Sequence, residues 1–151
     1  MGVVEVLQTN GLFKGFTPPG VQIIAGIASE RTFPPGSPIF VESMIADAMF
    51  VIAQGRVGLK AKTKAGAEVS LGELGAGEQI GELALIQPGQ RMCTATALTS
   101  VTAIELRHAD FQRLLAAKPQ ACVKLLMAIV SRFAQKVTEN REALRSLLGK
   151  P

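Results

Sequence analysis

Apolar residues follow a helical period at both ends of the chain and a strand-like alternation in between. Near the N-terminus they recur three and four positions apart, at Val3, Val6 and Leu7 and again at Val21, Ile24 and Ala25. This spacing predicts helices within residues 3–28. Thr17 followed by Pro18 and Pro19 predicts the start of the second helix, because threonine caps a helix and proline is tolerated in its first turn.

Residues 29–106 contain short apolar runs that are interrupted by turn signals. The signals are Pro34-Pro35-Gly36, Gly55, Ala65-Gly66, Gly75 to Gly77 and Pro88-Gly89. Their regular spacing predicts an all-β sandwich or barrel. The clearest strand is residues 57–64, whose apolar positions alternate with Lys60, Lys62 and Lys64. We interpret these lysines as a solvated sheet face, with a phosphate-binding patch as the alternative.

Residues 107–148 return to the helical period. A short helix is expected to open at His108 and end near Lys118, and Pro119 is expected to start a longer helix that reaches about Leu148 and measures about 45 Å. Apolar residues repeat there every seven positions, in the two series Val123, Val130, Val137, Leu144 and Leu126, Phe133, Asn140, Leu147. This repeat predicts a coiled-coil homodimer through residues 119–148, with Asn140 fixing the register. The alternative is one apolar face that packs on the chain's own barrel.

Composition describes one folded domain, residues 1–151, with 48% hydrophobic residues and a formal net charge of +4. The charge is uneven, because nine of the sixteen basic residues follow Leu106. That excess fits either an acidic partner or a solvated helix face. The longest uncharged stretch, residues 15–29, is too short to span a bilayer, and the MGVVE start lacks a basic signal region. We therefore expect a cytoplasmic protein without membrane insertion.

Few residues in the chain offer metal or redox chemistry. Cys93 and Cys122 lie in apolar surroundings, which favours buried, reduced thiols over a disulfide or a nucleophile. The single histidine, His108, cannot supply the histidine cluster of a metal-dependent cupin enzyme. We therefore expect no metal, no cofactor and no catalytic residue.

One stretch, residues 77–95, combines a glycine, a carboxylate and an isolated arginine. Gly81 allows a backbone conformation or close approach that a side chain would block. Residues 82–86 have the length of one helical turn, whose free N–H groups can bind an anion. Arg91 is the only basic residue between Lys64 and Arg107. It is expected to bind either an external phosphate, with Glu82 accepting from sugar hydroxyls, or Glu82 itself in a structural salt bridge.

The sequence G-E-L-A-L followed by R-M-C-T-A closely resembles the phosphate-binding cassette of cyclic nucleotide-binding domains. Further marks of that family are Phe50-Val51-Ile52 running into Gln54-Gly55-Arg56-Val57, and the turn Leu74 to Gly77. The resemblance covers about residues 12–147. It implies a mainly β fold with flanking helices: an eight-stranded jelly-roll β barrel (29–106) with N-terminal helices (1–28) and C-terminal helices (107–151), of which the last is long.

The resemblance also assigns roles in ligand binding. It implies that Arg91 holds the cyclic phosphate and that Glu82 with the Gly81 backbone holds the ribose 2′-hydroxyl. The implied set of contacts is Gly81, Glu82, Leu83, Ala84, Arg91, Met92 and Cys93, with Leu71 and Ile80 in the apolar wall and Arg132 near the base. The amides of Ala84 and Met92 are expected to complete the phosphate cradle. Met92 stands where cGMP-preferring members often have threonine, so cAMP is the expected ligand and cGMP the alternative.

The implied function is that of a non-catalytic receptor. Ligand binding is expected to move the helices that follow Arg107 and to signal to a separate, unknown effector protein. A dimerising scaffold that keeps the fold but binds no nucleotide is the alternative. Because no helix-turn-helix can be assigned before Pro151, direct DNA binding is not expected.

Overall fold

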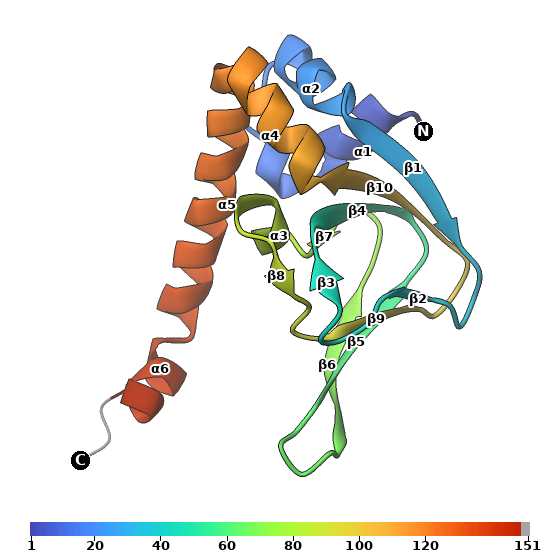
Figure 1. Ribbon diagram of the computed structural model, residues 1–151, viewed down its shortest axis with the longest axis vertical. Coiled ribbons are helices and arrows are strands. Elements are labelled where there is room, and N and C mark those ends of the chain that lie inside the picture. Colours follow the sequence, from blue (N-terminus) through green and yellow to red (C-terminus); the bar gives the residue numbers. More distant parts are fainter. Residues whose placement is uncertain (149–151) are drawn as a thin grey trace.

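A computed structural model describes the backbone of residues 1–148 and the side chains of residues 1–146 (Figure 1). Short helices open the chain, strands fill its middle and helices close it. The helices and the 3₁₀ turn are α1 (Val3–Thr9), η1 (Gly11–Phe13), α2 (Pro18–Ala25), α3 (Leu83–Ile86), α4 (His108–Ala117), α5 (Pro119–Glu139) and α6 (Arg141–Leu148).

The strands lie between residues 28 and 107. They are β1 (Ala28–Phe33), β2 (Pro38–Phe40), β3 (Ile45–Ala46), β4 (Ala48–Gln54), β5 (Val57–Lys62), β6 (Glu68–Leu74), β7 (Gln79–Ile80), β8 (Gly89–Gln90), β9 (Thr94–Ala97) and β10 (Val101–Arg107). Eight of them form two four-stranded antiparallel sheets, in the orders β1-β10-β4-β7 and β2-β9-β5-β6, and β3 pairs with β8. The predicted mainly β jelly-roll class is confirmed, although hydrogen bonds do not close the sheets into one barrel.

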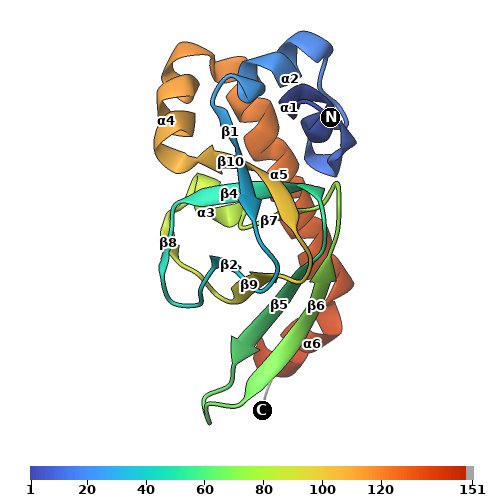
Figure 2. The same ribbon diagram turned by 90° about the vertical axis from the view of Figure 1, so that its right-hand side faces the viewer.

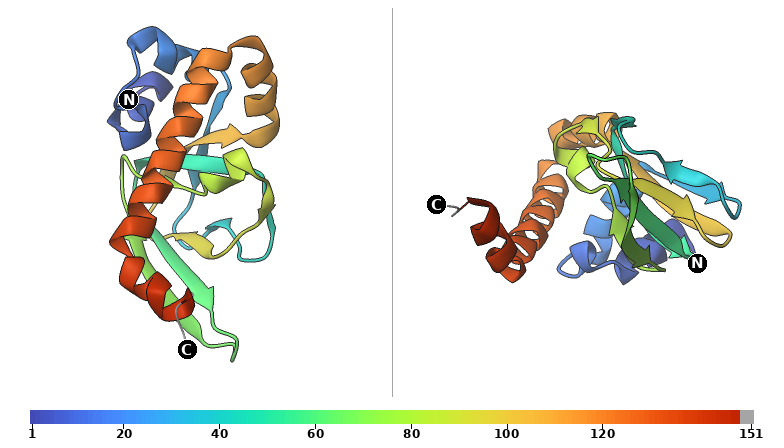
Figure 3. Two further views of the ribbon diagram at one scale, coloured as in Figure 1. Left: turned by 90° about the vertical axis from the view of Figure 1, so that its left-hand side faces the viewer. Right: turned by 90° about the horizontal axis from the view of Figure 1, so that it is seen from below.

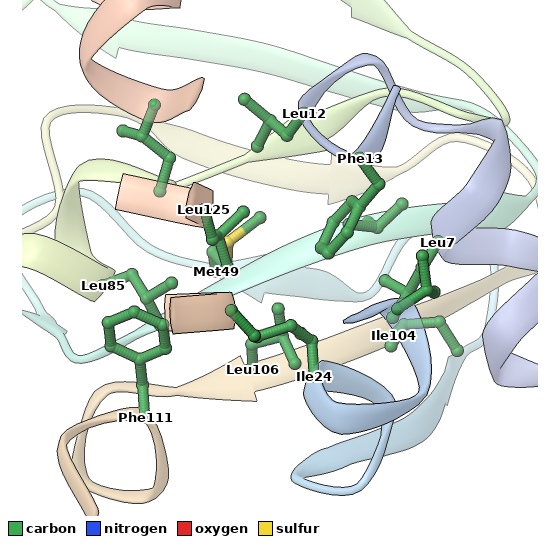
Figure 4. Close-up of a cluster of buried hydrophobic side chains, with 14 of the residues drawn as sticks. Leu7, Leu12, Phe13, Ile24, Met49, Leu85, Ile104, Leu106, Phe111 and Leu125 are labelled. Carbon is green, nitrogen blue, oxygen red and sulfur yellow. The ribbon is translucent and has the colours of Figure 1, made fainter. Parts of the chain in front are cut away.

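The helices at the two ends of the chain share one core. Leu7 and Ile24 from the N-terminal helices and Phe111 and Leu125 from the C-terminal helices pack with Met49 on β4 (Figure 4). The predicted cap is present, since the Thr17 hydroxyl accepts a hydrogen bond from the Gly20 amide at 3.3 Å. Burial of this apolar surface joins α1 and α2 with α4 and the first half of α5 to the β1-β10-β4-β7 sheet.

A second core lies between the two four-stranded sheets. Phe33, Phe50, Ile52, Val57 and Ala95 are all buried in it. The predicted strand at residues 57–64 is confirmed for residues 57–62, and its apolar side faces this core. Lys60 points the other way and lies 3.4 Å from Glu68 of β6. The β5–β6 hairpin extends away from the body of the molecule (Figure 2).

The predicted single helix from Pro119 to Leu148 is wrong, because the chain forms two helices there. α5 ends at Glu139, and Asn140 leaves the helical conformation with φ −106° and ψ 21°. The Asn140 side chain donates to the Lys136 carbonyl at 2.8 Å, a local bond that competes with continued helix. α5 therefore has 21 residues and is about 32 Å long.

Only the first half of α5 packs on the body of the protein. Its buried residues are Ala121, Cys122, Leu125 and Ile129, and the rest of the helix extends away from the sheets (Figure 3). The proposed seam is half exposed, with Val130 at 55% and Phe133 at 52%, so the alternative that it packs on its own barrel fails for these residues. The Leu147 side chain, the last member of the repeat, lies outside the described residues.

Among residues 1–148, no helix is both long enough and apolar enough to cross a bilayer.

Candidate functional site

The cassette begins with a glycine that no other residue could replace without strain. Gly81 follows β7 with φ +74°, in the left-handed region that favours glycine. A Cβ atom at this position would collide with Nη1 of Arg91 and approach the Ala48 carbonyl oxygen to 3.2 Å. Glu82 then occupies the position before α3, the predicted single turn of helix, and its side chain makes no capping hydrogen bond there. The glycine therefore lets the start of α3 lie directly against the Arg91 side chain.

Arg91 is the central charged residue of the site. It follows β8, and its side chain is only 7% exposed. Its Nη2 donates to the Ala48 carbonyl at 2.8 Å, and its guanidinium carbon lies 4.1 Å from the centre of the Phe40 ring. Nε is buried and has no hydrogen-bond partner among the described residues. An unsatisfied buried donor costs about 1–3 kcal/mol, so this N–H can gain from an added acceptor.

The backbone of Arg91 is held by an irregular turn. The Arg91 carbonyl accepts from the Ser43 amide, and the Arg91 amide donates to the Met44 carbonyl, both at 2.8 Å. Ser43 has φ +72° and is the only described residue other than glycine with a positive φ. Two successive residues thus face Arg91, as in a β-bulge whose first residue is left-handed. Such strain persists where the surrounding structure fixes it, often beside a ligand site.

Arg91 and Glu82 do not form the salt bridge that was the alternative interpretation. No ion pair or hydrogen bond joins them among the described side chains. Burial lowers the pKa of Arg91 below its ordinary value, while the nearby carboxylates of Asp47 and Glu105 act in the opposite direction. The guanidinium therefore has acidic groups in its surroundings but no carboxylate in contact.

The remaining cassette residues differ in exposure. Ala84 is buried, and its amide donates to the Gly81 carbonyl at 3.0 Å, so the expected phosphate donor is already engaged. Leu83 is 43% exposed and Met92 is 80% exposed. Cys93 is half-buried and reduced, and burial together with Glu42 raises the pKa of its thiol against the influence of Arg91. The prediction of buried thiols is confirmed for Cys122 alone.

The residues expected to form the apolar wall, Leu71 and Ile80, and the expected base contact, Arg132, lie outside the segment 81–93. Ile80 is 5% exposed and packs in the core between the sheets, whereas Leu71 on β6 is 56% exposed. Arg132 is exposed on α5, three and seven positions after the buried Ile129 and Leu125. That spacing puts it on the helix face turned toward the body, beyond the point where packing ends. The structure thus joins Gly81 and Arg91 but not Arg132.

Sequence reasoning missed Phe40, Ser43 and Ala48 as neighbours of Arg91. They precede it by more than 40 positions, and only the pairing of the 43–46 segment with residues 89–91 brings them together. A positive-φ serine has no signature in the chain. A cation–π neighbour also leaves no periodic pattern.

A groove borders this site on the outer side of the β2-β9-β5-β6 sheet. It measures about 360 Å³ and is lined by Val41, Glu42, Ser43, Lys60, Ala61, Lys62, Thr63, Glu68 and Thr94. Lys60 pairs with Thr94, whereas the neighbouring pair Leu59 and Ala95 faces the inner core, so the two pairs point to opposite sides of the sheet. The groove shares Thr94 with the cassette, and Ser43 with the turn that bonds to the Arg91 backbone. The described residues hold no cluster of three metal-binding side chains.

The sequence and the fold were compared with those of known proteins. The sequence model of a family described as "Cyclic nucleotide-binding domain" matches residues 30–118. The "CRP-like cAMP-activated global transcriptional regulator" of Mycobacterium tuberculosis is 27% identical over 85% of this chain. The match covers 58% of that regulator, so the chain spans about three fifths of its length.

Two solved structures share both the fold and more than a quarter of the aligned residues with this chain. The N-terminal domain of a transcriptional regulator from Streptomyces coelicolor superposes with a TM-score of 0.79 and 34% identity, covering 87% of this chain and 94% of that one. The Catabolite Activator Protein of Thermus thermophilus superposes with a TM-score of 0.76 and 28% identity, covering 88% of this chain and 62% of that one. The regions around Gly81 and Arg91 lie inside the family match.

Proposed function

The chain belongs to the cyclic nucleotide-binding domain family, and from this premise we propose that it is a non-catalytic receptor for cAMP. Residues 1–148 form the receptor domain in this proposal, and its output goes to a separate effector protein. The curated relatives are longer than this chain. The proposal therefore concerns only ligand sensing and signalling by the described residues, and not the other activities of those relatives.

One observation carries the proposal: the Arg91 guanidinium is buried without a carboxylate in contact. A buried cation without a counter-ion is unfavourable, and an anionic ligand would remove that cost. The Nε donor lacks a partner, and a phosphate can accept two parallel bonds from a guanidinium. Glu82 is free to accept from the ribose 2′-hydroxyl, since it forms no ion pair among the described side chains.

The nucleotide is assigned by two arguments. The relative from Mycobacterium tuberculosis is named for activation by cAMP. Met92 cannot donate the hydroxyl bond to guanine that a threonine could, so cGMP is the weaker candidate. The contacts proposed for the ligand are Gly81, Glu82, Leu83, Ala84, Arg91, Met92 and Cys93, with Leu71 and Ile80 in the wall and Arg132 near the base.

Binding would act first on α3. The Ala84 amide now donates to Gly81, so a phosphate oxygen that takes this donor must reorganise the turn. The Leu85 carbonyl in the same turn accepts from Nδ1 of His108 at 2.7 Å, and His108 begins α4. Leu85 also packs in one core with Phe111 and Leu125 (Figure 4). These contacts connect the cassette to α4 and α5.

The ligand would shift a population between two positions of these helices. In the ligand-bound position α4 and α5 move toward the base, which brings Arg132 closer to the nucleotide. The shift can be only as large as the difference in ligand affinity between the two positions. This coupling is what makes the domain a receptor that signals.

The exposed face of α5 is the proposed dimer interface. Five apolar side chains on it are between 40% and 63% exposed: Val123, Met127, Val130, Phe133 and Val137. Their spacing of three and four residues makes one continuous stripe. A second copy of the helix would bury it as a coiled coil, which Asn140 would limit to α5. The reduced cysteines agree with the cytoplasmic location that we propose.

Calorimetric titration with cAMP, cGMP and a cyclic dinucleotide tests the receptor. Wild type is expected to bind cAMP most tightly. Arg91→Ala should lose about 2–5 kcal/mol of binding free energy, which is roughly thirty- to several-thousand-fold in Kd. The matched control is Arg113→Ala, an exposed arginine paired with Asp110 on α4, which should bind as wild type does. Equal cAMP affinity of wild type and Arg91→Ala would contradict the site.

A dimerising scaffold that binds no nucleotide is the second candidate, and the exposed stripe on α5 is the observation that favours it. Both candidates predict a dimer by light scattering. Only the receptor predicts that cyclic nucleotide raises the unfolding temperature, because a ligand that binds the folded state alone stabilises it. A dimer without such a shift would select the scaffold, and a monomer would exclude the interface on α5.

A further inference from the structure

The face of the Arg91 guanidinium is covered by an aromatic ring rather than by a carboxylate. The guanidinium carbon lies 4.1 Å from the centre of the Phe40 ring, well inside the range of a cation–π contact. We propose that Phe40 is a positioning residue, which orients Arg91 for the phosphate without neutralising it. This inference rests on the proposed receptor function.

Two contacts together fix the plane of the guanidinium. The ring of Phe40 restricts its tilt, and the hydrogen bond from Nη2 to the Ala48 carbonyl restricts its rotation within the plane. Gly81 leaves room beside Nη1, and Nε has no partner. The guanidinium is thus held by Phe40 on one face and by the Ala48 carbonyl at Nη2. Its Nε and Nη1 donors remain available to a ligand.

A ring suits this role better than a carboxylate would. A carboxylate in contact would take the parallel hydrogen bonds that a phosphate needs and would compete with it for the charge. The attraction of an aromatic face leaves the guanidinium with its full charge and its N–H edge. The cost of burying the cation is thereby reduced before the anion arrives, and the binding geometry is already set.

The Phe40 ring is held in place by other aromatic rings. Phe40 lies on β2, and its ring centre is 6.3 Å from that of Phe50, whose own ring meets Phe33 at 6.2 Å and 77°. The Phe40 backbone pairs with Ala95 of β9. The turn that follows it, residues 41–44, bonds to the Arg91 backbone through Ser43 and Met44. One short segment therefore places both the main chain of Arg91 and the face of its side chain.

The test is a double-mutant cycle on cAMP affinity. Phe40→Leu removes the aromatic face but keeps an apolar side chain of similar bulk, and Phe40→Tyr keeps the face. Each is made in wild type and in Arg91→Lys, whose point charge lacks the planar fork. In wild type, Phe40→Leu is expected to weaken cAMP binding about threefold to thirtyfold, and Phe40→Tyr less than about twofold.

The Arg91→Lys background separates positioning from packing. If Phe40 acts through the guanidinium, Phe40→Leu should change the remaining affinity of Arg91→Lys by less than about twofold. An equal loss in both backgrounds would show that Phe40 supports the fold alone, and would overturn the inference. Wild-type affinity in Phe40→Leu would overturn it while leaving the receptor intact. A wild-type protein that binds no cyclic nucleotide would overturn both.

Discussion

Two charged side chains in this protein are almost equally buried, and their surroundings differ in one respect. Glu105 on β10 is 6% exposed and Arg91 is 7% exposed. Glu105 accepts from Arg31 at 3.1 Å and from Arg107 at 3.2 Å, so its counter-ions belong to the chain. Arg91 contacts a ring and a carbonyl, but no carboxylate in the part of the chain that the structure describes.

The two residues therefore illustrate a charge paired within the fold and a charge left without a contacting counter-ion. Burial of a charge is unfavourable unless the protein pairs it. On β1 and β10, Glu105 is paired with two arginines of the chain. In the cassette, Arg91 has no such pairing among the described residues. In the proposed function, the buried Arg91 pairs with an anion from outside the chain.

The first prediction concerns the ion pairs of Glu105. Glu105→Gln keeps the shape of the side chain but removes the charge that both arginines contact. We expect the free energy of unfolding to fall by about 1–2 kcal/mol, since two charge-assisted bonds are weakened but the arginines are partly solvated. Urea denaturation measures this.

Affinity for cAMP should change by less than about twofold in Glu105→Gln, because Glu105 is not in contact with Arg91 and is the weakest of the groups that act on its pKa. The control is Glu30→Gln on the neighbouring strand β1, an exposed position without an ion pair among the described residues, which should alter stability by less than about 0.5 kcal/mol. A stability equal to wild type in Glu105→Gln would show that the internal pairing contributes nothing.

The second prediction applies a similar change to the unpaired site. Arg91→Met replaces a buried charge that has no carboxylate in contact among the described residues with an apolar side chain of comparable length. We expect the unfolding free energy of the ligand-free protein to stay within about 1 kcal/mol of wild type, because loss of the contacts to Phe40 and Ala48 is offset by removal of the desolvation cost. Urea denaturation without nucleotide is the measurement, and a fall of more than about 2 kcal/mol would mark Arg91 as structural.

Parts of the fold were predictable because their causes are local. The cap at Thr17, the glycine conformation at 81 and the start of α5 at Pro119 each depend on residues within one turn. The end of α5 at Asn140 is also local, but the seven-residue repeat masked it. Periodicity reports which face is apolar and not whether the helix continues.

The site was predictable only in part. Arg91 and Gly81 were identified from their types and spacing, and the structure brings them into contact. Sequence could not decide between a salt bridge and an unpaired Arg91, since that depends on where Glu82 points. The contacts to Phe40 and Ala48 depend on strand pairing across the whole middle of the chain, which no local pattern specifies.

The unpaired Nε–H of Arg91 offers the most direct test of the account. Its resonance can be assigned in a ¹H–¹⁵N NMR spectrum by its absence from Arg91→Lys, and then followed during titration with cAMP. We predict a downfield proton shift and slower exchange with water as the donor gains a phosphate acceptor. Saturation with cAMP that leaves this resonance unchanged would contradict the claim that the buried arginine receives its counter-ion from the ligand.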